Sequence, residues 1–255
     1  MALSLISSIS SQTTKYPTKP PVVVKPTNVN FLATIGAFTT VFGGTTGSFT
    51  SSTTKTITGT QYYNGTYIIK CNYWAMEGTI SNPGSSIGRM FDNNTSTYGH
   101  SVWTGASFVV NFGHNGNQIG FIDQSYDTTT GAYKLGSTFK TTIGSTNYFG
   151  DYIDIILPIA IVLKKYRTMT RIDATARYPR QRYIFGSNDG GTTWTLLSQW
   201  LVNTAVAAGT YSEVTISYAG QPTSYTLIRL VINSVNSGSG GFWNLAEINM
   251  IFDVA

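Results

Sequence analysis

The sequence predicts an all-β sandwich of short strands, and three observations lead to this fold class. The 255 residues include 26 Gly, 16 Tyr and 13 Phe, which favours strands joined by turns. No long stretch repeats its apolar residues with the 3.6-residue period of a helix. Apolar and polar residues alternate instead with a period of two, as in a half-buried strand. The side chains expected to face inward are Ile153, Ile155, Leu157, Ile248, Met250 and Phe252.

Three strands with two turn clusters are expected to end the chain, at residues 183–197, 225–232 and 242–252. The first of them contains Ser-Asn-Asp-Gly-Gly at 187–191, where Asn, Asp and Gly tolerate the positive φ angles of a tight turn. The Thr- and Trp-containing segment that follows suits a half-buried pleated surface. The sequence therefore predicts a hairpin turn at 187–191.

The order of these segments resembles that of the coagulation factor V/VIII C-type domain, also called discoidin, and of family 32 carbohydrate-binding modules. Residues 90–98 resemble the family's early segment, an apolar pair followed by Asp, a small turn and Thr. Trp103 lies near the usual downstream Trp, and residues 151–162 resemble a strand pair that ends in an apolar run. The resemblance covers residues 48–255 and implies a discoidin-like (galactose-binding-like) jelly-roll β-sandwich.

Residues 1–47 are interpreted as an extended N-terminal arm rich in Pro, Thr and Ser, outside the sandwich of residues 48–255. Four prolines at 15–26 favour a polyproline-like path that cannot join a central sheet. Such an arm is either disordered or laid along a neighbouring subunit. The chain between Trp103 and Asp151 is longer than the family's usual connection, and an inserted hairpin is expected around 107–150.

Charge and cysteine content narrow the classes of partner. Charged residues make up only 11% of the chain, which is common in proteins that pack into assemblies or meet sugars. The net charge of +5 comes from lysines that precede Glu77, and no nucleic-acid docking motif accompanies them. The single cysteine, Cys71, excludes an intramolecular disulfide and is expected to be buried on a strand. Neither a signal peptide nor a transmembrane segment is recognised.

The candidate catalytic patterns have simpler explanations, so the chain is not expected to be an enzyme. Residues 84–88 fit G-x-S-x-G, but a Pro-containing segment precedes them where that motif requires a strand. His100 and His114 lack the spacing of a zinc site. Asp151 and Asp154 lie three apart on a strand and point to opposite faces, which argues against a paired-carboxylate site.

The resemblance implies that ligands are bound by loops at one end of the sandwich, where aromatic rings stack on sugars or insert into lipid. Arginines near such rings could fork onto hydroxyls or carboxylates. A second interpretation is that the arginines decorate the start of a strand and the tryptophans fill the core. The candidate ligand-binding residues are Trp74, Tyr98, His100, Trp103, Tyr178, Arg180 and Arg182.

The resemblance also implies a structural calcium ion where the early Asp-turn-Thr loop meets the carboxylate of the last strand. The matching residues are Asp92, Asn94, Thr97 and Glu247. Calcium requires several oxygen ligands, which such a turn can supply. In the alternative interpretation, Asp92 and Thr97 bond only to their own turn and Glu247 caps the sheet.

These features predict a non-enzymatic structural protein of a virion: a capsid-associated decoration, minor capsid or fibre component. Its arm would bind other capsid proteins within a larger or homo-oligomeric assembly. The arm, the low charge and the missing secretion signal lead to this prediction, and the virus assignment rests on resemblance to discoidin-like segments of large DNA viruses. The alternative is a lectin-like module that binds host cell-surface glycans for attachment. The two functions are compatible.

Overall fold

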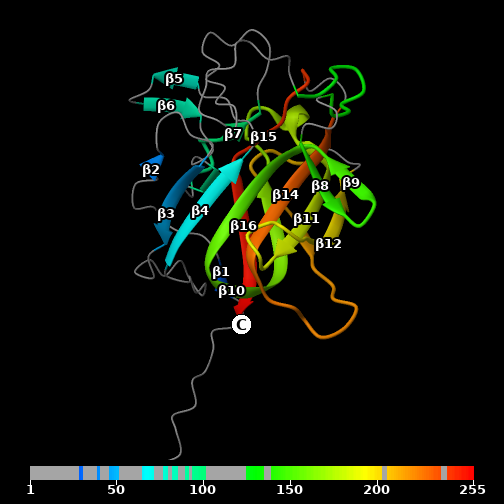
Figure 1. Ribbon diagram of the computed structural model, residues 1–255. Coiled ribbons are helices and arrows are strands. Elements are labelled where there is room, and N and C mark those ends of the chain that lie inside the picture. Colours follow the sequence, from blue (N-terminus) through cyan, green and yellow to red (C-terminus); the bar gives the residue numbers. More distant parts are fainter. Residues whose placement is uncertain are drawn as a thin grey trace, which may run out of the picture.

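The computed structural model describes residues 29–30, 39–40, 46–51, 65–71, 77–79, 82–85, 90–91, 94–101, 125–134, 139–202, 206–236 and 240–255. Strands dominate this part of the chain, and its one named helical element is the 3-10 turn η3 (Thr175–Arg177). The predicted all-β fold is therefore confirmed (Figure 1).

Most strands belong to one sheet that supplies both layers of the structure. Its main path runs through β12 (Thr195–Leu201), β11 (Pro179–Ser187), β14 (Tyr225–Val235), β10 (Asp151–Met169), β4 (Gly65–Cys71), β3 (Thr46–Ser51) and β2 (Thr39–Thr40). Off this path, β13 (Tyr211–Thr215) and β16 (Glu247–Val254) pair with β10, and β1 (Val29–Asn30) pairs with β16.

The 19-residue strand β10 connects the two layers. Its first part, up to Ile156, lies between β14 and β4, whereas its second part, from Ile161, lies between β13 and β16. Pro158 falls between the two parts, where the register with β14 shifts, because proline has no N–H to donate to a neighbouring strand. The segment 151–162, expected as a strand pair, is thus part of one continuous strand that passes from layer to layer (Figure 1).

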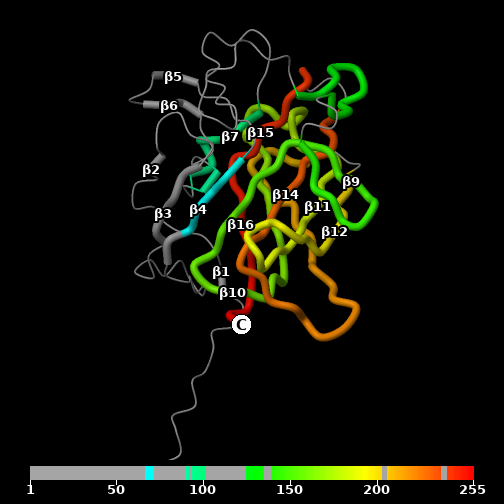
Figure 2. Tube along the Cα trace, in the orientation of Figure 1, coloured from blue at the N-terminus to red at the C-terminus, as the bar shows by residue number. Residues whose placement is uncertain are grey.

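Both ends of β10 lie at the same end of the sandwich. Asp151 pairs with Ile232 near the end of β14, and Met169 pairs with Glu247 at the start of β16. Backbone hydrogen bonds join the neighbouring loops there, such as that from the N–H of Tyr126 to the carbonyl of Gly241. We call this region the loop end; it comprises residues 94–101, 125–134, 170–178 and 240–246. Figure 2 shows these segments, which are distant in the sequence, gathered on one side of the strands.

The core lies between the two layers, and the predicted alternation is confirmed. Side chains of both parts of β10, of β14 and of β16 belong to one apolar cluster. Cys71 also lies in this cluster, as expected, and burial raises the pKa of its thiol. The six residues expected to face inward are all at most 7% exposed: Ile153, Ile155, Leu157, Ile248, Met250 and Phe252.

The predicted turn at 187–191 is present between β11 and β12. Gly190 and Gly191 have φ angles of 70° and 92°, in the region that favours glycine. The Asp189 carboxylate accepts hydrogen bonds from the backbone N–H groups of Thr192 and Thr193, at 3.0 and 2.9 Å. The turn therefore combines glycine conformations with a side-chain cap.

A short hairpin, β8 (Lys140–Ile143) and β9 (Thr146–Phe149), packs against the outer face of β11. The Tyr148 ring lies 4.8 Å from that of Tyr183 and 5.1 Å from that of Phe185, both edge-on. This hairpin falls within the range 107–150 where an insertion was expected, but residues 107–124 lie outside the described part. Two further pairs are β5 (Glu77–Thr79) with β6 (Asn82–Ser85), and β7 (Gly99–His100) with β15 (Asn244–Leu245).

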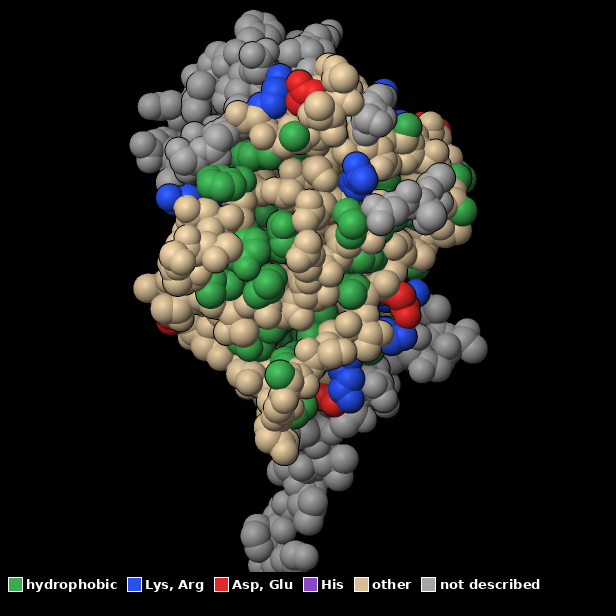
Figure 3. All heavy atoms as spheres, turned by 90° about the vertical axis from the view of Figure 1, so that its right-hand side faces the viewer, with side chains coloured by type: hydrophobic (Ala, Val, Ile, Leu, Met, Phe, Trp, Pro, Cys, Tyr) green, Lys and Arg blue, Asp and Glu red, His purple; other side chains and the backbone are tan. Residues whose placement is uncertain are grey.

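Two short strands lie within residues 1–47, the segment assigned to an arm. β1 pairs with Ile251 and Phe252 of β16, and β2 pairs with β3. These two contacts belong to the sheet, whereas the Pro-rich stretch at 15–26 lies outside the described residues. On the face that Figure 3 shows, charged side chains are few and hydrophobic ones gather in the middle, in agreement with the low charge of the chain.

Candidate functional site

The turn at 94–97 contacts the start of β16. The backbone N–H of Asn94 donates to Oε1 of Glu247 at 2.9 Å, and Glu247 is buried. Within the turn, Oδ1 of Asn94 accepts from the N–H of Ser96 at 3.1 Å, and the Thr97 hydroxyl donates to the Asn94 carbonyl at 2.8 Å. The structure thus brings together three of the four residues predicted for a metal site.

The fourth residue of that predicted site, Asp92, lies outside the described residues. In agreement with the alternative interpretation, Thr97 bonds within its own turn, but Glu247 accepts from that turn, whereas a cap on the sheet was expected of it. Within the described ranges, no group of three or more His, Cys, Asp or Glu side chains is arranged to hold a metal ion. Calcium binding therefore stays a prediction.

Tyr98 and His100 follow the turn and lie close together at the loop end. Their ring centroids are 5.9 Å apart, and the His100 ring is 6.2 Å from that of Phe242. The guanidinium of Arg171 lies 3.4 Å from the centroid of the Tyr98 ring, and that of Arg177 lies 4.5 Å from that of Phe242. Tyr98 is half-buried and His100 is buried, so the rings mainly hold the loops to one another.

Tyr178 and Arg182 lie in the interior, at 1% and 0% exposure. Nη1 of Arg182 donates to the hydroxyls of Thr168 and Tyr178, at 2.6 and 2.8 Å. Its guanidinium stacks over the Trp200 ring, 3.5 Å from the centroid. Neither side chain is available to a ligand at the surface, so the structure does not support the ligand contacts predicted for them.

The buried guanidinium of Arg182 has no carboxylate partner among the described residues. Its Nε and Nη2 also have no hydrogen-bond acceptor there. Burial lowers the pKa of Arg182, because a charge in a medium of low polarity is poorly solvated. The aromatic faces of Trp200 and Tyr178 offset part of this cost. Arg182 therefore has a structural role.

Arg180 is the predicted ligand residue that lies at a pocket on the surface. The pocket has a volume of about 470 Å³ and lies near the loop end. It is lined by Thr130, Ala132, Tyr133, Phe149, Arg180, Gln181, Asn233 and Ser234. Trp74 and Trp103, the remaining two candidates, lie outside the described residues.

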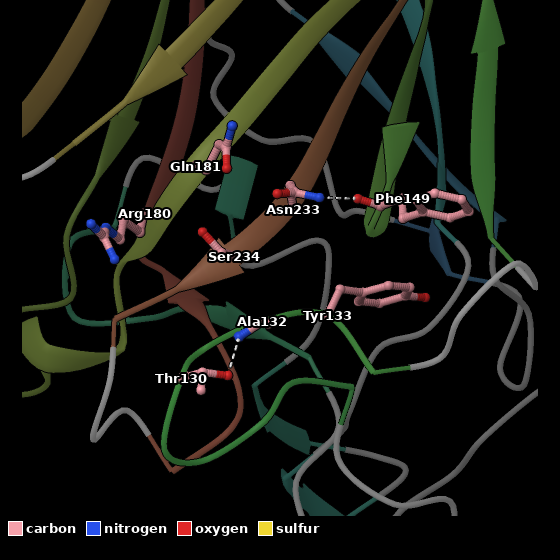
Figure 4. A pocket seen from close by; sticks show the side chains of 8 residues that line it. All are labelled: Thr130, Ala132, Tyr133, Phe149, Arg180, Gln181, Asn233 and Ser234. Atoms are coloured by element: carbon pink, nitrogen blue, oxygen red, sulfur yellow. Dashed lines mark hydrogen bonds between the residues drawn. The ribbon is translucent and has the colours of Figure 1, made fainter. Parts of the chain in front are cut away.

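Hydrogen bonds to the protein orient the two amide side chains of the pocket. Nδ2 of Asn233 donates to the carbonyl of Phe149 at 2.9 Å, and Nε2 of Gln181 donates to the Tyr183 hydroxyl at 2.8 Å. Each amide therefore keeps its carbonyl oxygen as an acceptor. In Figure 4 these two oxygens point toward the middle of the group, where the Ser234 hydroxyl also lies.

Pairing of distant segments builds this pocket. Ala132 forms a β-bridge with Ser234, which brings the 125–134 loop onto the end of β14. Pro179 pairs with Val235, which places the start of β11 beside the same end. Sequence reasoning found Arg180 but missed Gln181, Asn233 and the two aromatic residues. Their only sequence signal is a position next to a strand end, which many polar and aromatic residues share.

The chain matches no family model and no curated protein. Solved structures with a similar arrangement include the family 32 carbohydrate-binding module of Clostridium perfringens NanJ, in complex with galactose. The identity is 15%, the TM-score is 0.42, and the match covers 72% of this chain and 93% of that one.

Two further similar structures have comparable scores. One is a family 32 module from Clostridium perfringens in complex with GalNAc-β-1,3-galactose, at 14% identity and a TM-score of 0.44, covering 71% of this chain and 94% of that one. The other is the C-terminal domain of a chitobiase from Bacteroides fragilis, at 14% identity and a TM-score of 0.47, covering 74% and 95%. The NanJ module and the module in complex with GalNAc-β-1,3-galactose are both family 32 carbohydrate-binding modules.

Among the described residues, none of the helical segments has the length and apolar character needed to cross a bilayer.

Proposed function

We propose that this protein is a non-enzymatic, lectin-like binding module that recognises a glycan in the pocket between β11, β14 and the 125–134 loop. The observation that carries the proposal is the convergence of the Gln181 and Asn233 carbonyl oxygens near Ser234, in a surface pocket of about 470 Å³. Fixed acceptors of this kind suit ligands with several hydroxyl donors.

Two aromatic residues also line the pocket and add apolar surface at its margin. Tyr133 and Phe149 both line the pocket and are half-buried, and in Figure 4 their rings extend to one side of it, away from the oxygens of Gln181 and Asn233. Aromatic surface beside fixed polar groups is the mixture that small-molecule sites use for contact area and orientation. A sugar can use both features, because its C–H groups can pack on an aromatic ring while its hydroxyls donate to the amide oxygens.

A glycan-array screen of the full chain, followed by titration of the best glycan, tests this proposal. Gln181→Ala removes one acceptor and is expected to weaken binding about threefold to tenfold, the usual net value of one hydrogen bond. Asn147→Ala is the matched control: it removes an amide whose one side-chain hydrogen bond among the described residues is to Thr142, on the β8–β9 hairpin. Equal binding by both variants, or a folded protein that binds no glycan, would contradict the proposal.

Calcium binding at Asp92, Asn94, Thr97 and Glu247 is a second part of the proposal. The support is the position of the 94–97 turn against Glu247. Isothermal titration with calcium chloride measures it directly, and Glu247→Gln is expected to abolish the heat. If the wild-type protein gives no heat at millimolar calcium, the proposed calcium site is wrong.

The virion role and the homo-oligomeric assembly stay predictions. The features that led to them are the N-terminal arm, the low charge of the chain and the missing secretion signal. A related feature of the described part is β12, which ends the sheet, lacks charged residues and exposes Leu196 and Leu201 by 36% and 48%. Light scattering of the full chain, with Leu201→Lys for comparison, tests self-association: a higher mass that the variant reduces is expected, and a monomer at all concentrations would speak against assembly.

A further inference from the structure

Arg180 has surroundings unlike those of the other arginines in the described part of the chain. The others either pair with carboxylates or lie over aromatic rings, as Arg167, Arg171, Arg177, Arg182 and Arg229 show. Arg180 is exposed and makes no ion pair or ring contact among the described residues. Its backbone is nevertheless fixed, because its carbonyl accepts from the N–H of Val202 at 2.9 Å.

Arg180 is also the one charged side chain of the eight that line the pocket, and none of the eight is acidic. In Figure 4 its guanidinium lies to one side, away from the convergent oxygens of Gln181 and Asn233. The pocket therefore has two chemically distinct parts. The centre accepts hydrogen bonds from neutral donors, and the margin offers a cation.

The acidic residue of the adjoining loop is engaged in its own turn. The Asp127 carboxylate accepts from the backbone N–H groups of Thr129 and Thr130, at 3.0 and 2.6 Å, and from the Thr130 hydroxyl at 2.9 Å. These bonds lower the pKa of Asp127, and Lys134 on the same loop contributes in the same direction. Asp127 is thus held by local donors and does not pair with Arg180.

We infer that the pocket selects an acidic glycan: one sugar unit occupies the centre, and its carboxylate or sulfate group extends to Arg180 at the margin. This inference rests on the proposed function. A guanidinium forms two parallel hydrogen bonds to either anion, which gives direction as well as charge. The same cation disfavours a protonated amino sugar, although the carbonyl oxygens alone would accept an ammonium group.

The experiment compares glycans that differ only in charge, with the full chain as the protein. The set contains a neutral oligosaccharide, its uronate or sialylated form, its sulfated form and its free-amine form. The acidic forms are expected to bind at least about tenfold more tightly than the neutral one, because a hydrogen bond to a charged group is worth more than one between neutral groups. The advantage should shrink as salt is raised.

Two variants locate the charge that is responsible. Arg180→Ala is expected to remove most of the advantage of the acidic forms and to change binding of the neutral form by less than about twofold; Arg180→Lys keeps the charge and should retain part of it. Lys164→Ala is the control, because it removes a positive charge of β10 that pairs with Asp253 of β16.

The outcomes distinguish a failure of the acidic-glycan inference from a failure of the proposed lectin-like function. Equal binding of neutral and acidic forms, or preference for the amine, would overturn the acidic-glycan inference and leave the lectin-like function standing. An acidic preference that survives Arg180→Ala would also overturn it. Failure of every glycan to bind a folded protein would remove both.

Discussion

Arg229 and Asp154 show how a charged pair is kept on the outer face of the sheet. Nε and Nη2 of Arg229 donate to the two carboxylate oxygens of Asp154 at 2.6 and 2.7 Å. The guanidinium also lies over the rings of Tyr152 and Trp194, at 4.0 and 4.1 Å. The β8–β9 hairpin adds a contact through the hydroxyl of Thr141. Sheet, hairpin and turn region thus meet at this pair.

Asp154→Ala is expected to lower the free energy of unfolding by about 3–5 kcal/mol, because it leaves a largely buried guanidinium without its partner. Asp253→Ala is the control: its pair with Lys164 is more exposed, and the expected loss is below about 1 kcal/mol. Urea unfolding followed by fluorescence measures both. Similar losses for the two variants would show that the Arg229–Asp154 pair stabilises the fold no more than an exposed ion pair does.

Arg182 is expected to tolerate loss of its charge better than loss of its volume. Arg182→Met keeps an apolar chain against Trp200 and should stay within about 1.5 kcal/mol of the wild type, because the buried charge itself is costly. Arg182→Ala should lose roughly 2–4 kcal/mol through the cavity it leaves. Glycan binding by Arg182→Met should be unchanged. A large stability loss in Arg182→Met would indicate that its two hydrogen bonds dominate.

Residue-level prediction from the sequence succeeded where the signal was local. The alternation in β10 and β16 fixes which face of each strand is apolar, and Ile155 and Ile248 are buried accordingly. Arg182 shows the limit, because arginine is mostly exposed in proteins and nothing nearby in the sequence marks this one as internal. Its burial depends on Trp200 of β12 and on Thr168 of β10, which are distant from it in the sequence.

At the scale of elements, the 125–134 loop is held closely against the end of β14. Gly131 has a φ of 73°, and a Cβ there would lie 2.0 Å from the Val235 carbonyl oxygen. The N–H of Val235 donates to the carbonyl of Gly131 at 2.9 Å. Only glycine permits this approach, and the approach is what brings Thr130 and Tyr133 to the pocket.

Gly131→Ala is therefore expected to displace the loop and to weaken glycan binding by more than about tenfold. Gly144→Ala is the matched control, since Gly144 also has a positive φ of 58° but has no atoms within 4 Å of the added Cβ. Titration of the best glycan, with circular dichroism to verify folding, makes the comparison. Undiminished binding by Gly131→Ala would show that the loop is not part of the site.

The turn between β11 and β12 should make the free energy of unfolding depend on pH in the acidic range. Hydrogen bonds from Thr193, with further ones from Ser187 and Thr192, hold the pKa of Asp189 below its ordinary value of 3.8. A carboxyl with a lowered folded-state pKa stabilises the fold above the ordinary value, and this contribution is lost as the pH falls below it. Asp189→Asn should therefore lose less stability than the wild type between about pH 5 and pH 2.5. Identical pH profiles of the urea midpoints would contradict this.

Turns and strands were predictable to the extent that one segment contains the whole signal. The Asn-Asp-Gly-Gly turn was found because four adjacent residues specify it. The passage of β10 from one layer to the other was not predicted, because it depends on which strands pair with β10 on either side of Pro158. The pocket was missed for the same reason, since Gln181 and Asn233 become neighbours only through the pairing of β11 with β14.

For the whole molecule, the described residues form a packed body and a loop end that is held together differently. The apolar core joins both layers, whereas the loops at one end are held by ring contacts, a capped turn and single bridges. The low charge leaves few strong electrostatic features on the surface, so an unpaired Arg180 beside a pocket stands out among the described residues. Fold class could be predicted from alternation, whereas the proposal of a glycan ligand required the arrangement of side chains at this end.

A crystal structure of the full chain with the strongest glycan from the array tests directly whether the pocket binds sugar. We expect a sugar ring in the pocket, with its hydroxyls donating to the side-chain oxygens of Gln181 and Asn233. A glycan bound instead at the rings of Tyr98 and His100, with the pocket empty, would contradict the account.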